Sequence, residues 1–205
     1  MKQFPEQIPV FPLSGVIYFP KTNLPLNIFE QRYLDLVNDT ISKDKLMGMI
    51  QGKKDSNDLY KIGCLGKISE FKKSEDGRIL INLTGITRFE ILEEKKSSKL
   101  YREFKVDYKK FSLDLEPVKE KINIDSLIKR AEIFFKKNGL LLNWREFEKL
   151  DVFQKINTLS MIAPITNEEK QKLLESVSLK EQAGSFEDIM NFYLHEVGFD
   201  SQTIQ

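Results

Sequence analysis

The spacing of apolar residues changes near residue 110, and this change constrains the fold more than any other feature of the sequence. Before it, short runs rich in β-branched and aromatic residues are separated by turn residues, which is typical of strands. After it, apolar residues recur every three to four positions, which is typical of one face of a helix. The sequence therefore predicts an α+β protein, with a β-rich domain over residues 1–110 and a helical bundle over residues 117–200.

Short strands at regular spacing dominate the first domain. Ile79, Ile81 and Leu83 alternate with more polar neighbours, which indicates a strand with one face more deeply buried. The Asp76-Gly77 pair before them supplies the positive φ of a hairpin turn. The expected strands are Val10–Leu13, Val16–Phe19, Leu46–Gln51, Tyr60–Phe71, Ile79–Leu83, Phe89–Leu92 and Tyr101–Tyr108. Such strands favour a small, mostly antiparallel barrel or folded sheet.

One helix interrupts this β-rich domain, and we expect it to run from Ile28 to Ser42. Asn27 is placed to cap its first turn, and Glu30 to complete a capping box three residues later. The apolar residues that follow recur at helical spacing, so one face of the helix should pack against the sheet. They are Tyr33, Leu34, Val37 and Ile41.

Four helices are expected in the second domain, where short connections favour a compact bundle. The first begins near Ile124 and ends at Asn138-Gly139, a C-terminal stop signal. The second is expected over 144–162. The third opens with Thr166 and Glu169, which have the spacing of a capping box. The fourth starts at Leu179 and is closed by Gly198. The segment 109–117 is expected to link the two domains.

Composition excludes several classes of chemistry. Cys64 is the one cysteine and His195 the one histidine, so the chain carries neither an internal disulfide nor a zinc cluster of Cys and His. The 32 Lys and Arg residues balance 31 Asp and Glu residues, whereas general nucleic-acid binders carry a large basic excess. We expect no metal, no cofactor and no membrane partner, and nucleic acid is not favoured. Prolines interrupt the N-terminal apolar stretch where a signal peptide needs a helical run, which indicates a cytoplasmic protein.

The segment from Gly63 to Ser69 is the nearest approach to a nucleotide-binding loop. Its glycines are too closely spaced, and no hydroxyl residue follows Lys67 directly, so a strand with small residues is favoured. Cys64 within it has no neighbouring histidine to activate it and is interpreted as a small buried residue. His195 is interpreted as a partly exposed side chain on the last helix. No catalytic residue is predicted.

Several motifs occur in an order that resembles the substrate-binding domain of Lon protease, also called the Lon N-terminal domain. The resemblance covers the chain from about Ile8 to Val197. It rests on the segments 8–13, 18–20, 24–26, 28–33, 60–68, 76–78, 83–91 and 163–175. The order of so many motifs is far more specific than any one of them. Lys21 stands where the family often has Gly, which places the local turn geometry in question.

The resemblance implies a PUA-like β-rich pseudo-barrel with one packed helix, followed by a helical bundle. It assigns mainly structural roles to the motif residues. Prolines fix the φ angle, glycine allows a close approach of the backbone, and other residues anchor elements in the core. Phe29 should anchor the helix into the barrel, and Arg88 should bind loop carbonyls or pair with Glu30. The motif residues are Pro12, Pro20, Pro25, Phe29, Glu30, Arg32, Tyr33, Gly85, Arg88 and Phe89.

The resemblance also implies a function. Neither the ATPase module nor the Ser-Lys protease module of Lon fits in this length, so we expect a stand-alone, non-catalytic module that binds unfolded or apolar protein segments, alone or with Lon or another protease. Tyr18, Phe19 and Phe71 are the candidates to line its peptide site. An RNA-associated role is the alternative, because PUA-like barrels also serve in RNA recognition, and it rests on fold analogy alone.

Overall fold

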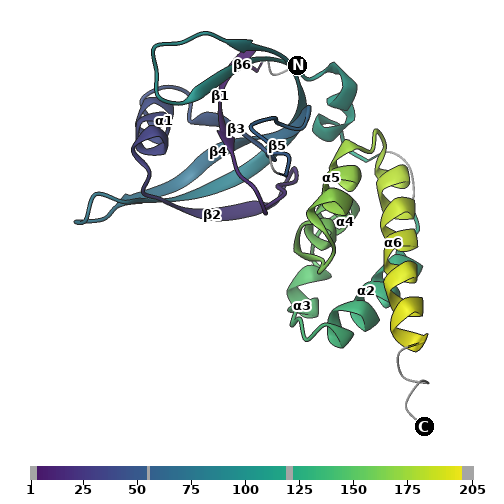
Figure 1. Cartoon of the computed structure of the whole chain (residues 1–205). Coiled ribbons are helices and arrows are strands. Elements are labelled where there is room, and N and C mark those ends of the chain that lie inside the picture. Colours follow the sequence, from purple (N-terminus) through teal and green to yellow (C-terminus); the bar gives the residue numbers. More distant parts are fainter. Residues whose placement is uncertain (1–3, 55, 119–121, 200–205) are drawn as a thin grey trace. The chain divides into compact units, whose positions relative to one another are not determined.

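The structure is a computed structural model that describes residues 4–54, 56–118 and 122–199. The chain forms two compact units, Met1–Glu116 and Pro117–Gln205, each of which is described by itself (Figure 1). The first unit contains the sheet and the second contains helices. No helix in the described ranges is long and apolar enough to cross a lipid bilayer.

The first unit is a closed, mixed sheet of six strands in the order β2-β5-β4-β3-β1-β6, with β6 also pairing to β5 (Figure 1). The strands are β1 (Gln7–Pro12), β2 (Asn23–Ile28), β3 (Leu46–Ile50), β4 (Ile62–Lys73), β5 (Ile79–Lys95) and β6 (Arg102–Asp107). β1 and β3 are parallel, and the other pairs are antiparallel. Together with the helices, this sheet confirms the predicted α+β class.

The long strand β5 closes the barrel because different parts of it pair with different neighbours. Its residues 79–84 pair with β2, residues within 79–90 pair with β4, and residues within 90–95 pair with β6. The sequence pattern predicted two separate strands, Ile79–Leu83 and Phe89–Leu92, whereas the backbone stays extended between them. The alternation was read correctly: Ile79, Ile81 and Leu83 are buried, and Leu80 is exposed.

Two predictions before the first helix are wrong. The run Val16–Phe19 forms no strand, although Ile17, Tyr18 and Phe19 are buried in the core. Asn27 caps no helix because it lies in β2, which pairs with β5 along its whole length. Pro25 is compatible with β2 because an edge strand leaves the position of a missing N–H free. Helix α1 (Gln31–Ile41) therefore begins later than expected, and Glu30 precedes it without a side-chain capping bond.

The core of the first unit lies inside the barrel. Phe89 is fully buried in it. One connected cluster comprises Ile8, Val10, Ile50, Leu65, Phe89, Phe104 and Val106. Helix α1 packs against β1 and β3, and its Tyr33 ring lies 4.2 Å from that of Phe11.

The second unit contains α2 (Asp125–Lys137), α3 (Trp144–Phe147), α4 (Val152–Ile162), α5 (Asn167–Glu175) and α6 (Leu179–Phe199). The expected single helix over 144–162 is divided, because Asp151 and Gln154 form a capping box that starts α4 anew. Thr166 and Glu169 form the predicted capping box of α5. Helix α6 packs against α2, α4 and α5.

Candidate functional site

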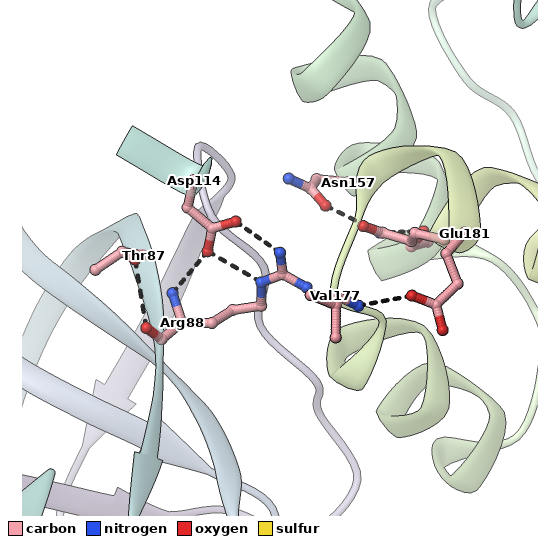
Figure 2. Close-up of polar contacts among 8 residues, drawn as sticks. Thr87, Arg88, Asp114, Asn157, Val177 and Glu181 are labelled. Atoms are coloured by element: carbon pink, nitrogen blue, oxygen red, sulfur yellow. Dashed lines mark hydrogen bonds and ion pairs between the residues drawn. The ribbon is translucent and has the colours of Figure 1, made fainter. Parts of the chain in front are cut away.

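A buried ion pair fixes the segment that follows the last strand. This segment, η1 (Lys109–Leu115), is a short 3₁₀ helix. The backbone N–H and Nε of Arg88 donate to Oδ2 of Asp114 at 2.9 and 3.0 Å, and Nη2 donates to Oδ1 at 2.6 Å. The two side chains are only 6% and 1% exposed. Figure 2 shows the Asp114 carboxylate facing both the guanidinium group and the backbone nitrogen of Arg88.

The same pair corrects two sequence-based predictions. The link expected over 109–117 is instead mostly a folded part of the first unit, because Asp114 and the fully buried Phe111 tie η1 to β5. The Arg88 guanidinium lies 4.3 Å from the centre of the Phe111 ring. Glu30 does not pair with Arg88; it accepts from Arg32 on the exposed surface at 2.7 Å.

Residues near the N-terminus pack beside η1. The hydroxyl of Tyr108 donates to the backbone oxygen of Pro5 at 2.9 Å. The Tyr108 ring lies 5.7 Å from that of Phe4. Burial raises the pKa of the Tyr108 hydroxyl, so it stays a neutral donor over the physiological pH range. Phe4, Pro5 and Tyr108 therefore form one wall next to η1.

Two adjoining hollows lie against this wall, with volumes of about 590 and 790 Å³. They share Phe4, Leu115 and Glu116, and we call them together the η1 groove. The first is completed by Lys67, Ser69, Thr84 and Ile86, and the second by Glu6, Leu92, Lys105, Val106, Asp107, Tyr108, Lys109 and Ser112. Leu92 and Leu115 are both exposed in the groove, so apolar surface faces the solvent.

Charges of both signs line the η1 groove. Its cations are Lys67, Lys105 and Lys109, and its carboxylates are Glu6, Asp107 and Glu116. The backbone and the polar side chains of a bound peptide would find both cations and carboxylates there, and its apolar side chains would contact the leucines. The balance of charge does not favour a polyanion such as RNA.

The structure does not bring the three predicted peptide-binding residues together. Tyr18 and Phe19 are 2% and 0% exposed, so both belong to the core and cannot contact a bound peptide directly. That prediction is corrected for these two residues. Phe71 is exposed on the far half of β4, where the Lys45 ammonium lies 5.8 Å from its ring centre, and it lines neither hollow.

The residues that line the η1 groove were not predicted from the sequence. Leu115 belongs to an alternation of leucine and polar residues over 112–116, in a segment interpreted as a linker, and this alternation was the available signal. Leu92 was predicted only as the last residue of the strand Phe89–Leu92, and exposure at a strand end carries no local mark in the sequence. Phe4 and Leu115 are far apart in the sequence, and only the fold brings them to one hollow. No local sequence pattern could therefore relate them.

Three residues singled out by the family resemblance, Gly85, Lys21 and Phe29, differ in their structural roles. Gly85 lies against the backbone of Phe19 and Pro20, and a Cβ there would lie 2.3 Å from the Phe19 oxygen. Lys21 adopts a φ of +57°, the left-handed region that favours glycine. Phe29 was expected to anchor the helix, but it is 65% exposed and thus anchors nothing in the barrel.

The nucleophile candidates are not arranged for catalysis. Cys64 is fully buried, and burial raises the pKa of its thiol well above its ordinary value. The thiol therefore stays protonated and poorly nucleophilic. His195 is exposed on α6. In the described ranges, no three His, Cys, Asp or Glu side chains are placed to hold a metal ion.

Comparison with known families decides the classification. The sequence pattern of the ATP-dependent protease La (LON) substrate-binding domain matches residues 7–191. The chain belongs to this family. The resemblance drawn from its motifs is thereby confirmed.

Lon proteases and isolated Lon domains are similar to this chain. A Lon protease of Syntrophus aciditrophicus is 26% identical over 94% of the chain, and one of Dictyoglomus thermophilum is 24% identical over 88%. The chain spans about a quarter of the length of these relatives, namely 26% and 24%. A Lon N-terminal domain protein of Xanthomonas campestris has the same fold, with a TM-score of 0.66, 19% identity, and coverage of 90% of this chain and 97% of that one.

Membership in this family identifies residues 7–191 as a Lon substrate-binding domain, that is, a substrate-recognition module. A second solved structure, the N-terminal domain of the Mycobacterium avium complex Lon protease, agrees with this fold at a TM-score of 0.63 and 15% identity, with 90% and 98% coverage. In this chain, the η1 groove is an exposed apolar feature of the barrel held in place by a buried ion pair.

Proposed function

We propose that this Lon substrate-binding domain recognises unfolded, apolar segments of other proteins in its η1 groove. The observation that carries the proposal is the exposure of Leu92 and Leu115 in a hollow beside η1, the segment that the Arg88–Asp114 pair holds. A preformed groove needs no ordering on binding, which limits the entropic cost of capture. Apolar side chains of a client would contact the leucines, and its backbone would bind the mixed polar rim.

In this proposal the 205 residues recognise clients without breaking bonds and act as an adaptor or a chaperone-like holder in the cytoplasm. The inert environment of Cys64 supports a role without covalent catalysis. Clients would be passed to Lon or to another protease. The alternative RNA-associated role has no support from the groove, where carboxylates offset the lysines.

A titration with one client in two states tests the proposal. We expect a reduced and alkylated protein, which cannot refold, to bind the chain, and its native form to release negligible heat. Leu115→Asp should weaken binding to the unfolded form about tenfold, because a buried leucine contact is replaced by a charge. Isothermal titration calorimetry gives the dissociation constants.

The matched control is Leu100→Asp. Leu100 is exposed in a loop and lines neither hollow, so this variant should bind like the unaltered chain. Circular dichroism verifies that both variants are folded. Equal affinity for the unfolded and native client, or equal weakening by both substitutions, contradicts the proposal.

A further inference from the structure

The connection between α2 and α3 in the second unit presents three consecutive leucines to solvent. Leu140 and Leu141 are exposed and Leu142 is half-buried. Leu141 has a relative exposure of 101%, so it is uncovered on all sides. We call the three residues the leucine tip. The groove of the first unit does not include it.

Hydrogen bonds anchor the leucine tip on both of its sides. At the end of α2, the N–H of Leu140 donates to the oxygen of Phe135 at 2.9 Å, and the N–H of Gly139 donates to that of Lys136 at 3.2 Å. These two bonds form a Schellman motif, with Gly139 at a φ of +69°. After the tip, Asn143 caps α3 by accepting from the N–H of Glu146 at 3.3 Å.

Three cations lie close to the leucine tip in the sequence. The segment from Ile133 to Arg145 contains Lys136, Lys137 and Arg145, all exposed. Glu132 precedes this segment and Glu146 follows it directly, and Glu146 is paired with Lys149 at 2.7 Å. The residues next to the tip in the sequence therefore carry a net positive charge.

Trp144, the one tryptophan of the chain, lies two residues after the leucine tip, with Asn143 between them. It is half-buried, with its ring 6.2 Å from that of Phe135 and 5.3 Å from that of Phe147. Tryptophan favours the boundary between hydrocarbon and water, where one edge of the ring stays polar. Its position predicts an indole at the level of the headgroups when the leucines are inserted.

We propose that the leucine tip inserts into anionic lipid surfaces and attaches the chain peripherally to a membrane. Because the leucine tip projects into solvent, only a partner that surrounds it can bury it fully. The disordered acyl chains of a lipid leaflet can surround it in this way. The three cations complement anionic headgroups. The expectation of no membrane partner came from the composition of the chain, which does not address insertion of a short loop.

Vesicles test this proposal through Trp144. With equal parts of phosphatidylcholine and phosphatidylglycerol at low salt, we expect a blue shift of its emission and co-flotation of the chain at millimolar lipid. Pure phosphatidylcholine should bind far less. Leu141→Asp should weaken partitioning at least tenfold, while the control Leu100→Asp should leave it unchanged.

Charge variants separate insertion from simple attraction. Combined Lys136→Gln and Lys137→Gln should weaken partitioning on the order of tenfold, and added salt should weaken it further. The matched control, Lys72→Gln with Lys73→Gln on the exposed end of β4, should have little effect. No partitioning of the unaltered chain, or equal partitioning of Leu141→Asp, overturns the proposal. Loss of unfolded-protein binding in Leu141→Asp without any vesicle binding also overturns it and assigns the tip to a protein partner.

Discussion

Replacement of Asp114 by Asn is expected to lower the free energy of unfolding of the β-rich unit by about 3–5 kcal/mol. The substitution keeps the shape of the side chain but removes the charge that compensates Arg88, whose side chain is 6% exposed. A buried guanidinium group without its carboxylate retains its desolvation cost and loses the attraction that offset it. Urea unfolding followed by circular dichroism measures the change, and hydrogen exchange of the β5 amides locates it.

Asp76→Asn is the matched control for this experiment. Asp76 also pairs with an arginine, Arg78, at 3.1 Å, but both side chains are more than half exposed. Exposed ion pairs contribute about 0–1 kcal/mol, so the control should change stability little. If the two substitutions have similar effects, the Arg88–Asp114 pair does not hold η1 in the way described. Client binding should fall together with stability in Asp114→Asn, because η1 forms a side of the groove.

Replacement of Gly85 by Ala is expected to destabilise the β-rich unit by about 3 kcal/mol. The added Cβ would lie 2.3 Å from the backbone oxygen of Phe19 and 3.0 Å from Cα of Pro20. Both neighbours are backbone atoms, so no side chain can rotate away. Hydrogen bonds from the N–H of Lys21 to the oxygen of Gly85 at 3.0 Å, and from the N–H of Gly85 to the oxygen of Thr22 at 2.9 Å, also resist a shift.

Gly184→Ala is the opposing control. Gly184 lies inside α6, and its added Cβ meets no atom within 4 Å. Alanine is favoured over glycine inside a helix, so this variant should gain about 0.5–1 kcal/mol. Thermal and urea unfolding of both variants give the signs. A Gly85→Ala variant as stable as the unaltered chain would mean that the loop at Phe19 can move away from β5.

Local signals in the sequence predicted local structure well. The alternation of Ile79, Ile81 and Leu83 gave the buried face of β5, and Thr166 with Glu169 marked the start of α5. Each of these signals depends on contacts within a few residues. The prediction at Asn27 was wrong because its capping pattern competed with the pairing of β2 and β5, which a local pattern does not reveal.

The candidate site was not predictable in the same way. Asp114 and Arg88 are 26 positions apart, and a lone aspartate in an apparent linker carries no mark of burial. The groove also brings together Phe4 and Leu115, which lie near opposite ends of the first unit in the sequence. Tyr18 and Phe19 were selected because they are aromatic, yet aromatic residues also fill cores, and burial is decided by the closed sheet.

The family resemblance conveyed the fold and the general role, whereas the binding surface required the structure. Its motif residues serve the barrel unequally, since Phe89 is fully buried while Phe29 is 65% exposed. Phe29 is therefore a motif residue that does not pack in the core of the barrel. The structure does not place Phe29 among the residues that line the η1 groove.

The most direct test of client recognition is site-specific photocrosslinking from the η1 groove. A photoreactive phenylalanine analogue is placed at Leu115 and, in a second preparation, at Leu80, which has nearly the same exposure of 45% against 43% but lies outside the groove. Each is irradiated with a reduced and alkylated protein and with its native form. We expect crosslinks from position 115 to apolar segments of the unfolded form only, and few from position 80. Equal crosslinking from the two positions, or crosslinking from position 80 alone, would show that the η1 groove does not bind clients.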